Sequence, residues 1–438
     1  MGKYFGTDGI RGVVGDFLTC DMAFRCGNAL ASSGDRPKIL VGGDTRVSRS
    51  MLTSSFSAGA MSAGADVVDV GVCTTPGIAF LTENTDVNFG IVVSASHNPV
   101  EYNGIKVFDG QGIKLNEDEE DALEEKFGKQ KHNKNDGIGQ YVQDFSKVKL
   151  YKKHLIDCCG CSLENLTIVL DGSNGTACKI APAVFRALRA KVVAINCKND
   201  GTRINKNCGS TCPEAMMKAV KRYKADVGFA FDGDADRIIA CDENGNMIDG
   251  DIIIFMLAKY FKSQGKLHQN TVVGTKHTNM GLEKDLQKEG IKLIRTDIGD
   301  KYVIAKMEEL GLNLGGEKSG HVILRDFAST GDGILTGIKL AEMMIKSGKK
   351  MSEMSQATIF PQCNIDCIVS DKAKILASEK LTQEIEKTQT ALGSDARIMV
   401  RASGTEPKIR IMIECQDNTL ATKYATNLKQ VVCQLDKA

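Results

Sequence analysis

The segment Phe89-Gly90-Ile91-Val92-Val93-Ser94-Ala95-Ser96-His97-Asn98-Pro99 joins an apolar run to a polar turn. The β-branched residues of the run predict a buried strand, and the Asn-Pro pair predicts a turn directly after it. Ser94, Ser96 and His97 therefore lie where a strand ends. A loop on a rigid scaffold is a common place for a reactive side chain, although serines at such a point also cap the next element.

The same pattern of strands and polar loops continues on both sides of this segment. Strands are predicted over 38–41 and 65–72, with a helix over 50–64 between them. This strand, helix, strand order with short glycine-rich connections favours α/β layers over a β-sandwich. A second α/β unit is predicted from the strand 166–170 onward, and a third from near Asp251.

The last part of the chain has a different order of elements. It predicts a strand over 365–369, a helical region over 372–392, strands over 398–400 and 409–413, and a closing helix over 419–435. This order is typical of a small α+β domain. The polar stretch 126–139 predicts a domain boundary shortly after it. We therefore expect three similar mixed α/β domains over 1–153, 154–250 and 251–360, followed by a small α+β domain over 361–438.

The overall composition excludes some classes of partner. A chain of 438 residues is too long for one ordinary core, so two to four domains are expected. Its 56 basic and 55 acidic side chains leave a net charge of +1, which argues against nucleic acid or a membrane surface as the main partner. The 15 cysteines are odd in number and irregularly spaced, and no signal peptide is evident. Reduced thiols in a cytoplasmic protein are the expectation.

Three carboxylates, Asp232, Asp234 and Asp236, follow an apolar strand predicted over 227–231. Side chains so placed repel one another unless a cation lies between them, and hard oxygen ligands suit Mg²⁺. A calcium loop is rejected because Arg237 stands where that loop needs glycine, and because a strand precedes the cluster instead of a helix. A solvated acidic turn stays open as the alternative.

Three further loops carry groups that could bind a phosphorylated polyol. The tail loop surrounds a glycine with cations and hydroxyls that suit a phosphate dianion, although an ordinary hairpin turn fits it about equally well. Its members are Arg401, Ser403, Gly404, Thr405, Lys408 and Arg410. Glu317, Ser319 and His321 form a set that could read sugar hydroxyls, or simply a solvent-facing loop. The glycine-rich opening 4–12 is either a flexible start or a loop that brings Arg11 to an anion.

Five motifs in this order resemble the α-D-phosphohexomutase family. They are Gly6-Thr-Asp-Gly-Ile-Arg-Gly12, Ser94-Ala-Ser-His-Asn-Pro99, Asp232-Gly-Asp-Ala-Asp-Arg237, Gly316-Glu-Lys-Ser-Gly-His321 and Arg401-Ala-Ser-Gly-Thr-Glu-Pro407. The resemblance implies a four-domain α/β enzyme around a central cleft. It also implies a mutase, in the isomerase class, that moves a phosphoryl group through a phosphoserine and a sugar bisphosphate.

The resemblance also implies a role for each motif residue. Ser96 would carry the phosphoryl group, and phosphoserine with the three aspartates would hold one Mg²⁺ per site. Near the transfer centre it places Arg11, Lys106 and His321, among which the general acid or base is expected. The sugar would contact His97, Arg237, Glu317 and Ser319. The phosphate that does not react would be held by Arg401, Ser403, Gly404, Thr405 and Arg410.

The form of the last motif, Gly404-Thr405-Glu406-Pro407, favours the amino-sugar branch of the family. The expected reaction interconverts glucosamine 6-phosphate and glucosamine 1-phosphate and feeds UDP-N-acetylglucosamine synthesis. Lys318 and Lys301 replace a glutamine and an arginine that are usual in that branch, so a phosphomannomutase or phosphoglucomutase is the alternative. A sugar-phosphate-binding protein without catalysis and a simple phosphatase are further alternatives. The expected state is a monomer or homodimer.

Overall fold

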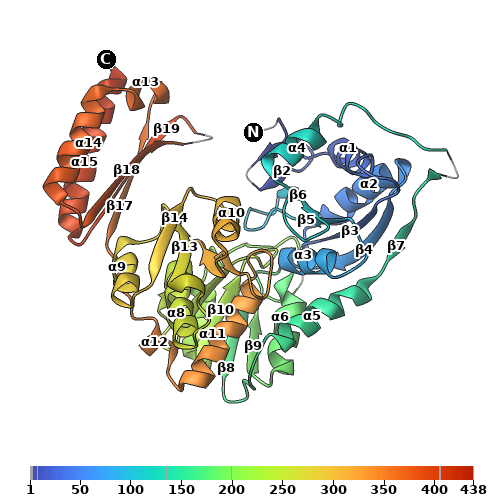
Figure 1. The fold of residues 1–438 in the computed structure, drawn as a ribbon, viewed down its shortest axis with the longest axis horizontal. Helices are drawn as coiled ribbons and strands as arrows, with labels where there is room; N and C mark the ends of the chain where they lie inside the picture. Colours follow the sequence, from blue (N-terminus) through green and yellow to red (C-terminus); the bar gives the residue numbers. More distant parts are fainter. Residues whose placement is uncertain (1–2, 7, 135–136, 199, 404–405, 438) are drawn as a thin grey trace. The chain divides into compact units, whose positions relative to one another are not determined.

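The computed structural model describes residues 3–6, 8–134, 137–198, 200–403 and 406–437. The chain divides into two compact units, one formed by 1–277 and 293–356, the other by 278–292 and 357–438. Figure 1 shows the elements of each unit, coloured along the chain. No helix among the described residues is long and apolar enough to span a bilayer. None of the 15 cysteines, all of which are described, is part of a disulfide.

The first sheet carries the serine loop. Its strands, in the spatial order β1-β2-β6-β5-β3-β4-β7, are β1 (Phe5–Gly6), β2 (Gly9–Val13), β6 (Tyr102–Asp109), β5 (Phe89–Val93), β3 (Lys38–Gly43), β4 (Asp66–Val72) and β7 (Tyr141–Gln143). Its helices are α1 (Cys20–Ala31), α2 (Arg49–Ser62), α3 (Thr75–Glu83) and α4 (Glu117–Glu124). The strands β5, β3, β4 and β7 are parallel, whereas β1, β2 and β6 pair antiparallel. The mixed sheet confirms the predicted α/β class.

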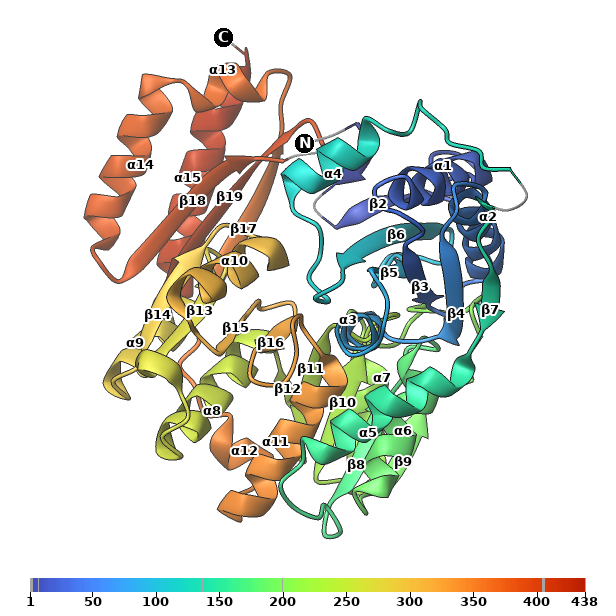
Figure 2. The same cartoon turned by 45° about the vertical axis from the view of Figure 1, so that its right-hand side comes forward.

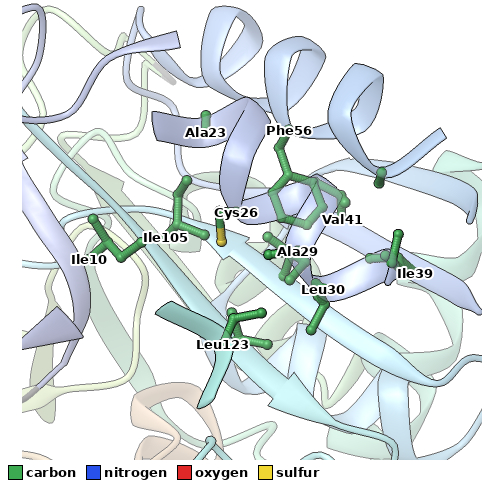
Figure 3. Close-up of a cluster of buried hydrophobic side chains, with 14 of the residues drawn as sticks. Ile10, Ala23, Cys26, Ala29, Leu30, Ile39, Val41, Phe56, Ile105 and Leu123 are labelled. Atoms are coloured by element: carbon green, nitrogen blue, oxygen red, sulfur yellow. The ribbon is translucent and has the colours of Figure 1, made fainter. Parts of the chain in front are cut away.

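Side chains alternate between two buried faces in the central strands of this sheet. Ile39 and Val41 of β3 belong to the core beneath α1 and α2, together with Phe56 (Figure 3). Leu40, between them, belongs to a second core on the other face, together with Ile78 of α3. Because successive residues of a strand point to opposite faces, a strand buried on both sides is apolar throughout. This is why the run 89–93 forms β5 with the bounds predicted from the sequence.

One expectation for this part of the chain changes with the structure. The opening, expected to be a loop or a flexible start, contains β1 and β2, which pair antiparallel with Gly6 opposite Gly9. Arg11 therefore lies on a strand. Lys106 lies on β6, whose Gly104 is the register partner of Arg11. Opposite residues share a face and so do residues two apart, so Arg11 and Lys106 lie on one face.

The second sheet ends at the acidic loop. Its strands, in the order β12-β11-β10-β8-β9, are β12 (Met247–Ile248), β11 (Ile238–Asp242), β10 (Val227–Phe231), β8 (Thr167–Asp171) and β9 (Lys191–Ile195). Its helical segments are η2 (Phe145–Lys147), α5 (Val148–Asp157), α6 (Ala177–Ala187) and α7 (Glu214–Tyr223). Because β10 and β11 are an antiparallel pair with Phe231 opposite Ile238, the residues 232–237 form the connection between them.

The third sheet carries the Gly316–His321 loop. Its strands, in the order β14-β13-β15-β16, are β14 (Lys292–Thr296), β13 (Thr271–Thr275), β15 (Leu314–Gly316) and β16 (Val322–Leu324). The helical segments are α8 (Gly250–Ser263), η3 (His268–Asn270), α10 (Asp300–Leu310), α11 (Gly333–Ser347) and α12 (Met351–Met354). Helices α8 and α10 lie on opposite sides of the sheet (Figure 2). Ile334, Ile338 and Ala341 of α11 are fully buried, so this face of the helix belongs to the core.

The smaller unit has the α+β order predicted for the tail. Its sheet, in the order β17-β19-β18, consists of β17 (Gln362–Ile368), β19 (Lys408–Cys415) and β18 (Ala396–Ala402). Its helices are α9 (Met280–Lys288), α13 (Lys372–Leu376), α14 (Glu379–Leu392) and α15 (Asn418–Lys437). Ile409, Ile411 and Ile413 of β19 pack in one core with residues of α14 and α15. The alternate residues of β19, including Arg410, therefore lie on the other face.

Candidate active site

The serine loop follows β5 and presents Ser96 from a strained backbone. Ser96 is buried and has a φ of 50°, in the left-handed region. A residue other than glycine in that region costs about 1–3 kcal/mol and is retained where the surroundings enforce it. The Ser96 hydroxyl donates to Asp232 Oδ2 at 2.5 Å, and its oxygen lies 3.3 Å from His97 Nδ1. Burial and the nearby cations Arg237 and Arg11 lower the pKa of His97 to about 4.

A buried ion pair holds this backbone in place. Arg46 Nε donates to Asp44 Oδ2 at 2.9 Å, and both side chains are fully buried. Arg46 Nη2 also donates to the carbonyl oxygens of Ser96 at 3.1 Å and Asn98 at 2.7 Å. Ser94 Oγ donates to Asp44 Oδ2 at 2.6 Å and accepts from the Ser96 N–H at 2.9 Å. Ser94 therefore supports the loop, whereas the Ser96 hydroxyl faces the acidic cluster.

Replacing Arg46 tests how much this pair contributes. We expect Arg46→Met to lower the free energy of unfolding by about 3–5 kcal/mol, because it leaves Asp44 charged and buried without its cation. Urea denaturation followed by circular dichroism measures the change. The matched control is Arg189→Met, since Arg189 pairs with Glu164 at the surface and such pairs contribute about 0–1 kcal/mol. Equal losses in the two variants would contradict the role given to Arg46.

The three aspartates form a buried cluster at the carboxyl end of β10. Asp232, Asp234 and Asp236 each offer an oxygen within 4.8 Å of the others. Burial, followed by the charges of Asp236 and Asp234, raises the pKa of Asp232 well above its usual value. Gly233 brings this loop against the serine loop, since a Cβ there would lie 2.6 Å from the Ser96 carbonyl oxygen. A solvated acidic turn is excluded, because all three side chains are buried.

The hydrogen bonds of this cluster show which oxygens could bind a metal. Oδ2 of Asp234 accepts from Thr75 Oγ1 at 2.7 Å and from Lys106 Nζ at 3.1 Å. Oδ1 of Asp234 and Oδ1 of Asp236 are buried and have no hydrogen-bond partner among the described residues. Buried carboxylate oxygens without donors are costly unless a cation compensates them. Hard oxygen ligands of this kind fit Mg²⁺.

Cations from the first sheet surround the same cluster. Lys106 Nζ is 3.1 Å from Asp8 Oδ2 and 3.5 Å from Asp236 Oδ2. Burial alone would lower the pKa of Lys106, but Asp234, Asp8 and Asp236 raise it above its usual value. Arg11 Nη2 pairs with Asp8, and its Nη1 donates to Asn98 Oδ1 at 3.3 Å. Two fixed positive groups thus lie beside the acidic cluster and the serine loop, since Lys106 contacts Asp234 and Arg11 contacts Asn98.

The loop 316–321 brings a histidine to the cluster. His321 is buried, and its Nδ1 is 3.7 Å from Asp236 Oδ2. Its Nε2 accepts from the Gly331 N–H at 3.2 Å, so both ring nitrogens face protein groups. Glu317 Oε1 accepts from the Gly299 N–H at 3.0 Å, and Ser319 is exposed. Arg237 Nε lies 3.9 Å from Asp236 Oδ1.

The predicted phosphate loop lies in the smaller unit. Arg401 of β18 and Arg410 of β19 are direct register partners, so their side chains share the face away from α14 and α15. Like charges at such positions are unfavourable, and Arg410 Nη2 donates to Glu406 Oε2 at 3.1 Å, so a carboxylate already partners one of the two cations. Ser403 Oγ accepts from the Glu406 N–H at 3.3 Å. Gly404 and Thr405 lie outside the described residues.

Several residues of the site were not singled out from the sequence. Asp8, Asp44, Arg46 and Thr75 are separated along the chain from the groups that they hold, and Asn205 donates to the Ser96 carbonyl at 2.8 Å across 109 residues. Asp8 lies inside the Gly6–Gly12 motif, which was the available signal for it. A strand end followed by Asp44-Thr45-Arg46 was the signal for the buried pair.

Comparison with known families identifies the class of protein. Family models described as "Phosphoglucomutase/phosphomannomutase, alpha/beta/alpha domain" I, II and III match residues 2–134, 141–245 and 249–360. The model described as the C-terminal domain of the same family matches residues 365–431. The chain belongs to this family of α-D-phosphohexomutases, and the predicted fold of four domains is confirmed.

Individual relatives are similar over the whole length. The chain is 42% identical over 443 residues to a protein of Staphylococcus epidermidis named phosphoglucosamine mutase, covering 99% of this chain and 98% of the relative. It is 44% identical over 445 residues to a protein of that name from Caldicellulosiruptor bescii, covering 99% of both. A solved phosphoglucomutase/phosphomannomutase family protein of Burkholderia thailandensis has a TM-score of 0.84 and 26% identity, covering 99% and 97% of the chains.

Proposed function

We propose that the chain interconverts glucosamine 6-phosphate and glucosamine 1-phosphate through a phosphoryl group on Ser96. The observation that carries the proposal is the buried Ser96 hydroxyl, 2.5 Å from Asp232 in a cluster of three buried carboxylates. Relatives at 42–44% identity bear the name phosphoglucosamine mutase, which supports the amino sugar as substrate. The reaction class is intramolecular phosphotransfer.

The proposed reaction conserves phosphate. In the first transfer the bond between phosphorus and Ser96 Oγ breaks, and a sugar hydroxyl oxygen forms the new bond to phosphorus while its proton passes to a base. The bisphosphorylated sugar then turns around. Ser96 Oγ takes back the other phosphoryl group, and the sugar oxygen that it leaves receives a proton. Phosphoryl transfer of this kind depends mainly on positioning and on stabilising charge.

The residues around Ser96 can perform both tasks. Asp232, Asp234, Asp236 and phospho-Ser96 would hold Mg²⁺, which when bound would neutralise charge on the transferring phosphoryl group. Lys106 and Arg11 provide fixed donors to phosphoryl oxygens. The raised pKa of Lys106 favours this charged role. The general acid or base is one of Arg11, Lys106 and His321.

Contacts with the rest of the substrate follow from the remaining loops. Glu317 and Ser319 would accept and donate hydrogen bonds to sugar hydroxyls, and His97 and Arg237 would provide further contacts to the substrate. Arg401, Ser403, Gly404, Thr405 and Arg410 would hold the phosphate that does not react. The opposed arginines of β18 and β19 support this role, because guanidinium groups bind phosphate in forks.

A comparison of substrates tests the proposal. The purified protein should turn over glucosamine 6-phosphate with a kcat/KM at least about tenfold above that for mannose or glucose phosphates, because polar contacts to a substrate group discriminate strongly. Peptide mass analysis should find the phosphoryl group on Ser96 and none on Ser94. Preference for mannose or glucose phosphate would reject the amino-sugar assignment, and release of inorganic phosphate equal to substrate consumed would indicate a phosphatase.

We further propose a cytoplasmic enzyme that acts as a monomer or homodimer on free sugar phosphates and not on nucleic acid or membranes. The near-zero net charge supports small molecules as ligands. The cysteine thiols support a reducing compartment, because disulfides persist mainly in oxidising ones.

A further inference from the structure

Thr75 connects the serine domain to the acidic loop by two hydrogen bonds. Its Oγ1 donates to Asp234 Oδ2 at 2.7 Å, and its backbone N–H donates to the Asp234 carbonyl oxygen at 3.0 Å. Thr75 and Asp234 are 159 residues apart in the chain, in regions matched by models of different domains. Both residues are buried, with exposed fractions of 2% and 0%. Water therefore does not compete for these bonds.

The position of Thr75 at the start of α3 explains why its backbone N–H can donate to a residue outside the helix. The first N–H groups of a helix have no partner within the helix. Thr74 caps α3 with its side chain, which accepts from the Gly77 N–H at 2.9 Å. The N–H of Thr75 is then available to Asp234. The hydroxyl that caps the helix belongs to Thr74 and the hydroxyl that bonds Asp234 belongs to Thr75, so the two roles can be tested separately.

Two side-chain hydrogen bonds to Oδ2 fix the orientation of the Asp234 carboxylate. Oδ2 is held by Thr75 from one element and by Lys106 Nζ from another. Oδ1 is left buried without a donor among the described residues. A carboxylate with one oxygen held in this way can offer only the other oxygen to a cation. Partners of this kind behind a metal ligand commonly change affinity by 10–100-fold when they are removed.

We propose that Thr75 is a positioning residue for Asp234: it holds Oδ2, so that Oδ1 would be the oxygen offered to a divalent cation, and it ties the metal loop to the domain that carries Ser96. The inference rests on the proposed Mg²⁺ site. Thr75 itself touches neither the cation nor the substrate, so its effect on phosphoryl transfer passes through Asp234.

The test measures binding of Mg²⁺ and Mn²⁺ by calorimetry to the full-length protein that carries a phosphoryl group on Ser96, as checked by intact-mass analysis. Thr75→Val keeps the shape of the side chain and removes the hydroxyl, and should weaken binding about 10- to 100-fold. Thr75→Ser restores the hydroxyl and should bind within about threefold of the parent protein. The matched control is Thr82→Val, since Thr82 is also buried in α3 and its Oγ1 donates to the Ile78 carbonyl of its own helix, at 2.8 Å. It should bind the cations like the parent protein.

The possible outcomes distinguish failure of the positioning role of Thr75 from failure of the proposed metal site. Unchanged affinity in Thr75→Val overturns the positioning role, and so does an equal loss in Thr82→Val, which would indicate a general effect on folding. Urea midpoints without metal identify variants that are unfolded. If the parent protein binds neither cation, the proposed metal site fails and the role of Thr75 fails with it. If the parent protein and Thr75→Val bind the cations equally well, the role of Thr75 is rejected and the proposed metal site is retained.

Discussion

Ser96→Ala should lower the rate of sugar phosphate interconversion by on the order of 10³-fold or more, because no other oxygen takes the place of the nucleophile. The Ser96 hydroxyl is the one directed to Asp232, at 2.5 Å. The variant should also lack the phosphoryl group in intact-mass analysis after incubation with a sugar bisphosphate. Turnover with both glucosamine phosphates, followed by mass analysis, gives the two readouts.

Ser94→Ala is the matched control for this variant. It removes the hydroxyl two residues away, which bonds Asp44 and the Ser96 N–H, so the loop loses support but keeps its nucleophile. We expect a loss of about tenfold from misplacement of Ser96, with phosphorylation retained. If Ser94→Ala were the inactive, unphosphorylated variant and Ser96→Ala remained active, the phosphoryl carrier would have been assigned to the wrong serine.

Asp232→Asn should have opposite effects on metal binding and on the stability of the metal-free protein. Removal of one carboxylate should abolish measurable Mg²⁺ binding and lower activity by on the order of 10³-fold, since charge stabilisation dominates phosphoryl transfer. The metal-free protein should be more stable than the parent at neutral pH. The reason is that burial and the like charges of Asp236 and Asp234 raise the pKa of Asp232, so its charged form opposes folding.

The dependence on pH checks the sign of this second effect. A carboxyl whose pKa is raised on folding does not affect stability below its unfolded pKa of about 3.9. Above that value it destabilises the protein increasingly, until the pH reaches the pKa of the folded state. The stability gain of Asp232→Asn should therefore disappear as pH falls toward the unfolded pKa. The control is Asp242→Asn, because Asp242 is a buried carboxylate outside the cluster that accepts from the Asn244 and Asn246 N–H groups. It should keep Mg²⁺ binding and lose stability. A less stable metal-free Asp232→Asn would contradict the repulsion argument.

The elements that were predicted well from the sequence depend on local patterns. The apolar run 89–93 forms β5 with unchanged bounds, and the helix predicted over 50–64 and the strand predicted over 65–72 form α2 and β4 with ends that differ by at most two residues. Helix α4 begins with a capping box formed by Asn116 and Glu119, which are three residues apart in the sequence. Periodicity and caps act over a few residues, so one sequence is enough to read them.

The parts that were not predicted depend on contacts between distant residues. Arg11 and Lys106 are neighbours because β2 pairs with β6, a pairing that neither segment encodes by itself. Thr75 and Arg46 act on residues 159 and 50 positions away. The motif resemblance leads us to expect the serine, the aspartates and the histidine in one site, whereas Thr75 and Asn205, which hold the loops from a distance, carry no signal in spacing or composition.

The backbone of Ser96 explains why a serine, and not a threonine, stands at this position. Both residues offer a hydroxyl that could carry a phosphoryl group, but Ser96 has a φ of 50°. Two heavy atoms on Cβ make the left-handed region strongly unfavourable, so a β-branched side chain would pull the loop toward another conformation. The identity of the phosphoryl carrier is therefore restricted by the shape of the main chain before its chemistry is considered.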